Sequence, residues 1–244
     1  MEITEIHYRM LQEETRRLGG DLFGVADLTQ TPIVTYDLDE DLLEKLPFGV
    51  SIGVRLADAV LEGIEDHPTL LYLHHYRQAN YILDRIAFHL AALIQRAGGN
   101  AIPIAASQIV NWEQQRGHLS HKELAQAAGL GWRGRNNLLV NPAYGARIRL
   151  VSILTDLPMQ VDKPVGNSCD TCRRCIAVCP AGAIKDDVEE FDQLGCFEKL
   201  KEFRNKYNVG QYICGVCIKA CQPQGQGSAL TFNQGIMKQP DLST

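Results

Sequence analysis

Eight cysteines lie between positions 169 and 221, and the first 168 residues contain none. Thiolates are ligands for zinc and for iron–sulfur clusters, and pairs of them also form disulfides. The first four, which have C-x2-C-x2-C-x3-C-P spacing, are Cys169, Cys172, Cys175 and Cys179. The other four are Cys196, Cys214, Cys217 and Cys221. In a chain with no sign of secretion, clustering of this kind indicates metal binding rather than disulfides.

The first run has the spacing of bacterial two-cluster ferredoxins, in which three cysteines hold one [4Fe-4S] cluster and the fourth holds the other. The spacing therefore predicts two ligand sets. One set is Cys169, Cys172, Cys175 and Cys221, and the other is Cys179, Cys196, Cys214 and Cys217. Gln211 replaces one cysteine of the simple repeat, so Cys196 must approach from a distance. Structural zinc, which also uses C-x2-C pairs, is the alternative.

The composition narrows the class of protein. The chain has 244 residues, of which 45% are hydrophobic, and a formal net charge of -5. This length suits one large domain or two modest ones, and the charge argues against a large nucleic-acid surface. No stretch is apolar enough to span a membrane, and the N-terminus lacks the apolar core of a secretory signal. We therefore expect a cytoplasmic protein that binds neither membrane nor nucleic acid.

Hydrophobic periodicity predicts an α+β fold. Helices are expected over 4–18 and 68–97, and strands over 21–26, 49–56, 101–106 and 147–155. Ser120 opens an S-x-x-E capping box for a short helix that ends near Ala128. A proline-containing linker then precedes the cysteines. The predicted organisation is an N-terminal domain over 1–165, a cysteine-rich domain over 166–224 and a C-terminal tail over 225–244.

A glycine motif follows the capped helix. Gly129, Gly131 and Gly134 match G-x-G-x-x-G. A dinucleotide fingerprint has to follow a strand and open a helix, whereas this motif follows a helix and leads into an apolar stretch. We therefore interpret Gly129 as a helix C-cap and reject a Rossmann NAD site. The three glycines still allow the backbone to approach a ligand closely.

The stretch AGLGWRGRNNLLVNPAYGARIRLVSILTDLPMQVDKP, followed by the cysteine run, resembles the epoxyqueuosine reductase and reductive dehalogenase superfamily of corrinoid-dependent double-cluster proteins. Members share an AGLGxxG turn, an LL(V/I)xPxYG stretch, a TDLP linker and a double-cluster domain. The YGARIRL and DLPMQVDKP portions are most similar to the dehalogenases. The resemblance is specific over 124–223 and weaker over 17–110, so we expect a short, divergent member.

The resemblance implies a nitroreductase-like fold for 1–165 and a ferredoxin-like double-cluster fold for 166–224. It also implies that the first domain holds a corrinoid such as cobalamin, and that the clusters deliver single electrons to its cobalt for reduction of a substrate. By the same resemblance, the residues that would form the corrinoid bed are Gly129, Gly131, Arg135, Asn136, Asn137, Leu138, Tyr144 and Gly145.

One catalytic feature of the family is missing. Epoxyqueuosine reductases carry a general acid in a D-S/T-A-P-like stretch, and Gln115 stands near the position of that aspartate. A glutamine cannot give up a proton, which weakens queuosine chemistry. Arg116, His118 and His121 lie where the family places its substrate pocket, and they are the candidate catalytic residues. The alternative is a solvated loop before a capped helix.

The sequence leaves two functions open. The first is an oxidoreductase that uses a corrinoid to reduce its own substrate. The second is a protein that passes electrons to a corrinoid or to a corrinoid protein partner without an organic substrate of its own. A flavin site is a third, weaker idea. A ferredoxin or flavodoxin is the expected electron donor. The enzyme hypothesis gains if Arg116, His118 and His121 face a cavity, and the carrier hypothesis gains if they face solvent.

Overall fold

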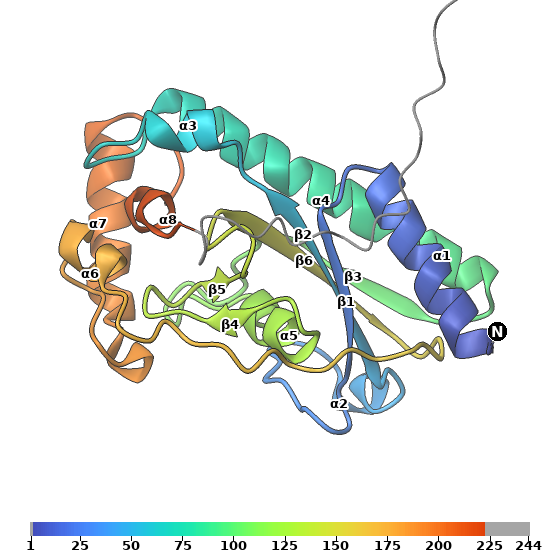
Figure 1. Cartoon of the computed structure of the whole chain (residues 1–244). Helices are drawn as coiled ribbons and strands as arrows, with labels where there is room; N and C mark the ends of the chain where they lie inside the picture. The colour runs from blue at the N-terminus through green and yellow to red at the C-terminus, as the bar shows by residue number, and fades with distance from the viewer. Residues whose placement is uncertain (1, 223–244) are drawn as a thin grey trace, which may run out of the picture.

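The computed structural model describes residues 2–222, so the predicted tail over 225–244 lies outside the described residues. Figure 1 shows the arrangement of the helices and strands. In chain order they are α1 (Ile3–Arg17), β1 (Leu22–Asp27), α2 (Glu40–Leu43), β2 (Phe48–Arg55), α3 (Asp58–Glu62), α4 (Leu70–Arg96), β3 (Ala101–Ile104), α5 (His121–Ala127), β4 (Trp132–Arg133), β5 (Leu139–Val140), β6 (Ile148–Thr155), α6 (Arg174–Val178), the 3-10 helix η1 (Val188–Glu190), α7 (Gln193–Lys206) and α8 (Val216–Ala220).

A four-stranded antiparallel sheet organises the N-terminal part. Its strand order is β1-β2-β6-β3, so β6 from late in the chain lies between β2 and β3. The central strands β2 and β6 are buried along nearly their whole length. Half of their residues are valine, isoleucine or leucine, which suit strands covered on both faces. The predicted strands are confirmed, with ends that shift by one or two residues.

Helices cover both faces of this sheet (Figure 1). On one face lies α4, whose N-terminus is capped by the Thr69 hydroxyl accepting from Tyr72 N at 3.0 Å. Leu83, Ile86 and Leu90 recur at helical spacing and are fully buried, so they form the apolar face of α4. On the other face lies α5, capped by the Ser120 hydroxyl as the sequence predicted. The mixed α/β class is therefore confirmed, while the division at residue 165 and the nitroreductase-like assignment stay predictions.

The two C-x2-C-x3-C repeats fold in the same way. Each forms a five-residue helix that begins two residues after the first cysteine of the repeat and ends directly before the last. These helices, α6 and α8, pack against each other, and α7 contributes Cys196. Figure 1 shows α6, α7 and α8 together at one end of the molecule. The repeat seen in the sequence is thus a structural repeat.

The cysteine-bearing helices are joined firmly to the sheet. The buried Arg147 donates to Asp58 at 2.8 Å and to the carbonyl of Lys219 at 2.7 Å. Lys219 in turn donates to the carbonyls of Glu62 and Ile64 at 2.9 and 2.7 Å. Because these bonds link α8 to α3 and to the start of β6, they fix the cysteines relative to the sheet. No helix within residues 2–222 is long and apolar enough to cross a membrane.

Candidate active site and cluster sites

Four cysteines line one cavity of about 280 Å³. They are Cys179, Cys196, Cys214 and Cys217, and we call them the inner cysteine group. Burial raises the pKa of Cys214 to about 12, and the neighbouring thiols of Cys196 and Cys179 add to the increase. Burial also raises the pKa of Cys217 strongly. The four residues that share this cavity are the four predicted to share one cluster.

The remaining four cysteines form an outer cysteine group, namely Cys169, Cys172, Cys175 and Cys221. Burial raises the pKa of Cys221 to about 11, and the thiols of Cys169, Cys175 and Cys172 contribute further. Burial raises the pKa of Cys175, again with help from Cys169 and Cys172. The side chains of each predicted set therefore influence one another. Among residues 2–222, no three histidine, cysteine, aspartate or glutamate side chains are placed to hold a single metal ion.

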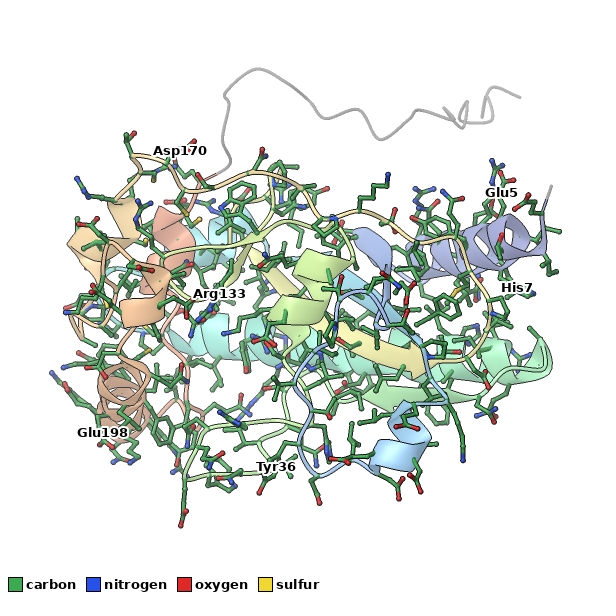
Figure 2. All side chains as sticks on the ribbon, turned by 90° about the horizontal axis from the view of Figure 1, so that it is seen from below. Glu5, His7, Tyr36, Arg133, Asp170 and Glu198 are labelled. Carbon is green, nitrogen blue, oxygen red and sulfur yellow. The ribbon has the colours of Figure 1, made fainter. Side chains whose placement is uncertain are left out.

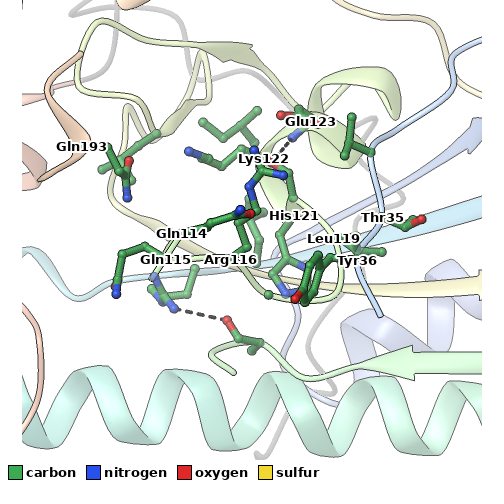
Figure 3. A pocket seen from close by; sticks show the side chains of 18 of the residues that line it. Thr35, Tyr36, Gln114, Gln115, Arg116, Leu119, His121, Lys122, Glu123 and Gln193 are labelled. Carbon is green, nitrogen blue, oxygen red and sulfur yellow. Dashed lines mark hydrogen bonds between the residues drawn. The ribbon is translucent and has the colours of Figure 1, made fainter. Parts of the chain in front are cut away.

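A larger cavity of about 590 Å³ adjoins the inner cysteine group. Its wall comes from residues 34–36, the segment 114–123, the hairpin β4–β5 and strand β6 (Figure 3). Its volume falls in the range of about 300–1,000 Å³ that is usual for ligand sites. The residues that line both cavities are Lys122, Leu138, Arg149 and Gln193. The large cavity and the inner cysteine cavity are thus adjacent, and we call these four shared lining residues the shared wall.

The three predicted catalytic residues lie near this cavity but in different settings. Arg116 is exposed and lines the large cavity, as does His121 (Figure 3). His118 instead lines a smaller cavity of about 170 Å³, with its Nδ1 3.1 Å from the carbonyl oxygen of Tyr36. Gln115, near the position of the family's aspartate, also lines the large cavity. The structure therefore brings Arg116 and His121 to the large cavity, and His121 also lines the smaller cavity with His118.

The ring of His121 is fully engaged in hydrogen bonds. Its Nδ1 lies 2.7 Å from the Ser152 hydroxyl, and its Nε2 lies 3.0 Å from the carbonyl oxygen of Ala105. A carbonyl only accepts, so Nε2 carries the hydrogen and Nδ1 accepts from Ser152. Burial lowers the pKa of His121 to about 4, and the nearby Arg149 lowers it further against the bond to Ala105. His121 is therefore neutral at pH 7 and holds the cavity wall rather than supplying a proton.

The predicted corrinoid bed divides into two groups. Asn136, Asn137 and Leu138 line the inner cysteine cavity, and Leu138 also lines the large one. The other five residues, Gly129, Gly131, Arg135, Tyr144 and Gly145, line neither cavity. Their contact with a corrinoid stays a prediction, and the structure gives each of them other neighbours.

Those other neighbours explain why glycine and arginine stand there. Gly129 has a φ of 73° just after α5, as a helix C-cap requires, and faces the Lys163 carbonyl. A Cβ at Gly145 would lie 2.2 Å from the carbonyl oxygen of Cys221. Arg135 donates to the carbonyls of Asp170 and Cys172 at 2.7 and 3.1 Å. The contacts of Gly145 and Arg135 hold the segments that carry Cys221 and Cys172 against the region of the hairpin.

Lys122 is a site residue that sequence reasoning missed. Its ammonium group donates to Asn137 Oδ1 at 2.9 Å, and it lines both cavities. Burial lowers the pKa of Lys122 to about 8, and the charge of Arg133 lowers it further. In Figure 2, Arg133 lies between α5 and the cysteine-bearing part of the chain, where it also pairs with Glu189 at 2.8 Å. A lysine of this kind is still mostly protonated at pH 7 and can give up its proton.

Tyr76 and Arg149 form a second missed pair. The Arg149 guanidinium lies over the Tyr76 ring, 4.6 Å from its centroid. Burial acts to raise the pKa of Tyr76, but Arg149 and hydrogen bonds with Ser107 and Asn80 outweigh it, so the pKa is lowered. Both residues line the inner cysteine cavity. Tyr76 therefore faces the inner cysteine cavity from the long helix α4.

Comparison with known proteins confirms the resemblance found in the sequence. The chain is 29% identical to an epoxyqueuosine reductase of Listeria monocytogenes over 134 residues, which cover 52% of this chain and 35% of that protein. It is 25% identical to the epoxyqueuosine reductase of Cyclobacterium marinum over 252 aligned positions, covering 91% of this chain and 80% of that protein. The chain thus matches about a third of the length of the first of these relatives. No protein-family model matches the chain.

Solved structures show the same fold. A catabolic reductive dehalogenase in complex with 3-bromo-4-hydroxybenzoic acid matches with a TM-score of 0.69 and 24% identity, over 89% of this chain and 32% of that one. An epoxyqueuosine reductase of Streptococcus thermophilus matches with a TM-score of 0.60 and 18% identity, over 89% and 68%. Another epoxyqueuosine reductase, solved with a tRNA stem loop, gives 0.55 and 21%, over 87% and 64%. With such a neighbour, the expectation that nucleic acid is excluded is unsupported.

Proposed function

We propose that this protein is an iron–sulfur oxidoreductase that passes low-potential electrons through two [4Fe-4S] clusters to a corrinoid, which reduces a substrate in the large cavity. The outer cysteine group holds the cluster that receives electrons, and the inner cysteine group holds the cluster that delivers them. A ferredoxin or flavodoxin in the cytoplasm is the proposed donor. Similarity to reductases supports the oxidoreductase class, and the clusters, the corrinoid and the substrate are the proposal.

The observation that best supports this proposal is that the two cavities share four lining residues. Lys122, Leu138, Arg149 and Gln193 line both. A ligand in the large cavity is therefore separated from the inner cysteine group by the thickness of a few side chains. Electron transfer falls off steeply with distance, so this arrangement supports direct transfer from an inner cluster to that ligand.

The lining of the large cavity suits a corrinoid. Gln114, Gln115 and Gln193 offer amide groups that can pair with the amides around a corrin ring. Leu139, Ile148 and other apolar side chains supply the broad surface that such a ring needs. A bound corrinoid would supply a cobalt centre able to accept single electrons and pass them to a substrate. In this proposal, Leu138 on the shared wall faces the corrinoid from the cluster side, and Asn137 lines the inner cysteine cavity behind it.

Lys122 is the proposed proton donor for the reduction, because it lines the large cavity, whereas Tyr76 lines the inner cysteine cavity. A general acid works best when its pKa lies near the working pH, and burial lowers the pKa of Lys122 to about 8. Asn137 holds the lysine between the two cavities. In this proposal, Lys122 replaces the aspartate whose position Gln115 occupies.

The second candidate is an electron carrier that handles a corrinoid for another protein. The observation that favours it is the absence of the family's acidic residue at Gln115. The position of Arg116 and Lys122 on a cavity of about 590 Å³ favours the enzyme. Arg116, the exposed cation of that cavity, is proposed to attract an anionic substrate group.

An anaerobic titration of the cluster-loaded protein with cob(II)alamin tests the proposal. We expect a saturable change to the base-off absorption spectrum. The matched variant is Leu138→Trp, which enlarges a side chain on the shared wall and should weaken binding while iron and sulfide contents stay at the wild-type level. A protein with both clusters intact and no spectral change would contradict the corrinoid proposal. Corrinoid binding without turnover of any halogenated or epoxide probe would favour the carrier.

A further inference from the structure

Two buried N–H groups on the hairpin β4–β5 have no hydrogen-bond partner among the described residues. They are Trp132 Nε1 and Asn136 Nδ2. Both side chains are only 4% exposed. A buried donor without an acceptor costs about 1–3 kcal/mol, so such groups are rare and call for an acceptor. Both residues belong to the part of the chain that packs against the cysteines.

Asn136 faces the inner cysteine group. Its side-chain oxygen accepts from Leu138 N at 3.3 Å, which identifies the other end of the amide as the nitrogen. Asn136 lines the same cavity as Cys179, Cys196, Cys214 and Cys217. The residue that carries this unpartnered amide nitrogen therefore lines the cavity that the four thiols share. Its amide oxygen also lies near the outer group, because a Cβ at Gly134 would be 3.0 Å from that oxygen and 3.5 Å from Cys169 Sγ. The missing acceptor is a sulfur atom of the cluster that those thiols would hold.

Trp132 lies beside the outer cysteine group. Trp132, Val140 and Ala146 form a buried apolar group, and Cys169 and Cys221 pack against that group. The indole ring has ample apolar contact here, but its N–H has no acceptor. Most buried indole N–H groups find one. A sulfur atom of the outer cluster is the acceptor that this neighbourhood offers.

We propose that the hairpin β4–β5 tunes the two clusters separately, with Asn136 Nδ2 donating an N–H···S hydrogen bond to the inner cluster and Trp132 Nε1 donating one to the outer cluster. This inference rests on the two-cluster assignment in the proposed function and is independent of the corrinoid. Hydrogen bonds to the sulfurs are among the features that set cluster potentials. A donor stabilises the more negative, reduced cluster, so each bond raises the potential of its own cluster.

The experiment is a reductive titration of the purified two-cluster protein, followed by electron paramagnetic resonance, in wild type and two variants. Asn136→Asp keeps the oxygen that accepts from Leu138 and loses the donor. Trp132→Phe keeps the apolar ring and loses the N–H. We expect each variant to lower one midpoint potential only. A tenfold fall in the equilibrium constant for one-electron reduction, which is about 59 mV, is the size expected for loss of one bond to a charged group.

A third variant identifies which reduction step of the titration belongs to which cluster. Cys172→Ser changes a ligand of the outer group and therefore marks the outer step. Trp132→Phe should move the marked step, and Asn136→Asp should move the other. Gln126→Leu is the matched control, because Gln126 is exposed on α5 and accepts from Arg133 N away from the cysteines. It should move neither step.

A measurement on the wild type guards against variants that fold poorly. Electron–nuclear double resonance of the reduced protein should detect exchangeable protons close to each cluster, and deuterium exchange should remove those signals. Unchanged potentials in both variants, or no exchangeable protons near the clusters, would overturn the inference. Iron and sulfide contents of about eight each per chain would show at the same time that the cluster assignment itself survives. Low contents in the wild type would instead refute the assignment.

Discussion

The cysteine-bearing segment and the large cavity differ in how strongly their chemistry depends on the tertiary surroundings of each residue. In the segment, the spacing of eight residues predicted two sets of four, and the structure groups the side chains in the same two sets. In the cavity, residue types near the predicted pocket indicated histidines as acid–base groups, but burial makes His121 neutral and makes Lys122 the better proton donor. The grouping of the cysteine ligands therefore follows from their spacing in the sequence, whereas the pKa of a side chain in the cavity depends on its tertiary surroundings.

The largest expected effect comes from the inner cysteine group. Cys217→Ser should abolish the inner cluster, because Cys217 is one of the four proposed ligands and burial raises the pKa of its thiol strongly. The iron content should fall from about eight to about four per chain, and electron transfer to cob(II)alamin should stop. Cys172→Ser, in the more exposed outer group, should retain more iron. If iron analysis showed that both variants lose the same amount of iron, the proposed difference between the two cysteine groups would be wrong.

The next largest effect concerns Lys122. Replacement by methionine keeps the length of the side chain and removes the proton, so the rate of corrinoid-dependent reduction should fall by about 10²–10³-fold. In the wild type, the rate should decline as the pH rises through about 8, since Lys122 then loses its proton. Lys122→Met should lose this decline.

Lys45→Met, at an exposed lysine far from the cavity wall, is the control and should behave as wild type. The probe is a halogenated compound, one of the two probe classes that test the proposed function. An unchanged pH profile in Lys122→Met would remove the lysine from the reaction.

His121 should affect stability rather than the chemical step. Its pKa is about 4 in the folded protein against an ordinary value of 6.5, so the unfolded chain binds more protons between these values. Stability is therefore complete above about pH 6.5 and is lost as the pH falls towards 4, by on the order of 3 kcal/mol. Thermal melting across this range should show the slope in wild type and a smaller slope in His121→Gln. His74→Gln, at an exposed histidine whose charge lowers the pKa of His75, should change the slope less than His121→Gln does.

Arg116 should give the smallest effect, because it is exposed and solvent screens its charge. Arg116→Met should raise the KM for an anionic probe about three- to tenfold, in keeping with about 1 kcal/mol for an exposed charge. The KM for a neutral probe should not change. Added salt should raise the wild-type KM and leave the variant unaffected. A variant whose KM rises equally for both probes would assign Arg116 a structural role.

The sequence predicted those parts of the fold that depend on local pattern. The capped helix at Ser120, the C-cap at Gly129 and the two C-x2-C-x3-C repeats are all signalled within a few residues. The pairing of Tyr76 with Arg149 joins positions 73 residues apart in the chain, and no local sequence pattern near either residue predicts it. Lys122 reads as an ordinary polar residue in the first turn of a helix, and only the packing of the hairpin and α7 around it lowers its pKa.

Leu138 gives the shared wall a further property. An electron at very low potential is easily lost to protons or oxygen if water reaches it. The apolar side chain of Leu138 lies on both cavities, whereas the other three residues that line both are polar. In the proposed electron path, Leu138 would keep water away from the space between the inner cluster and the large cavity, and Lys122 would supply the proton where the electron arrives.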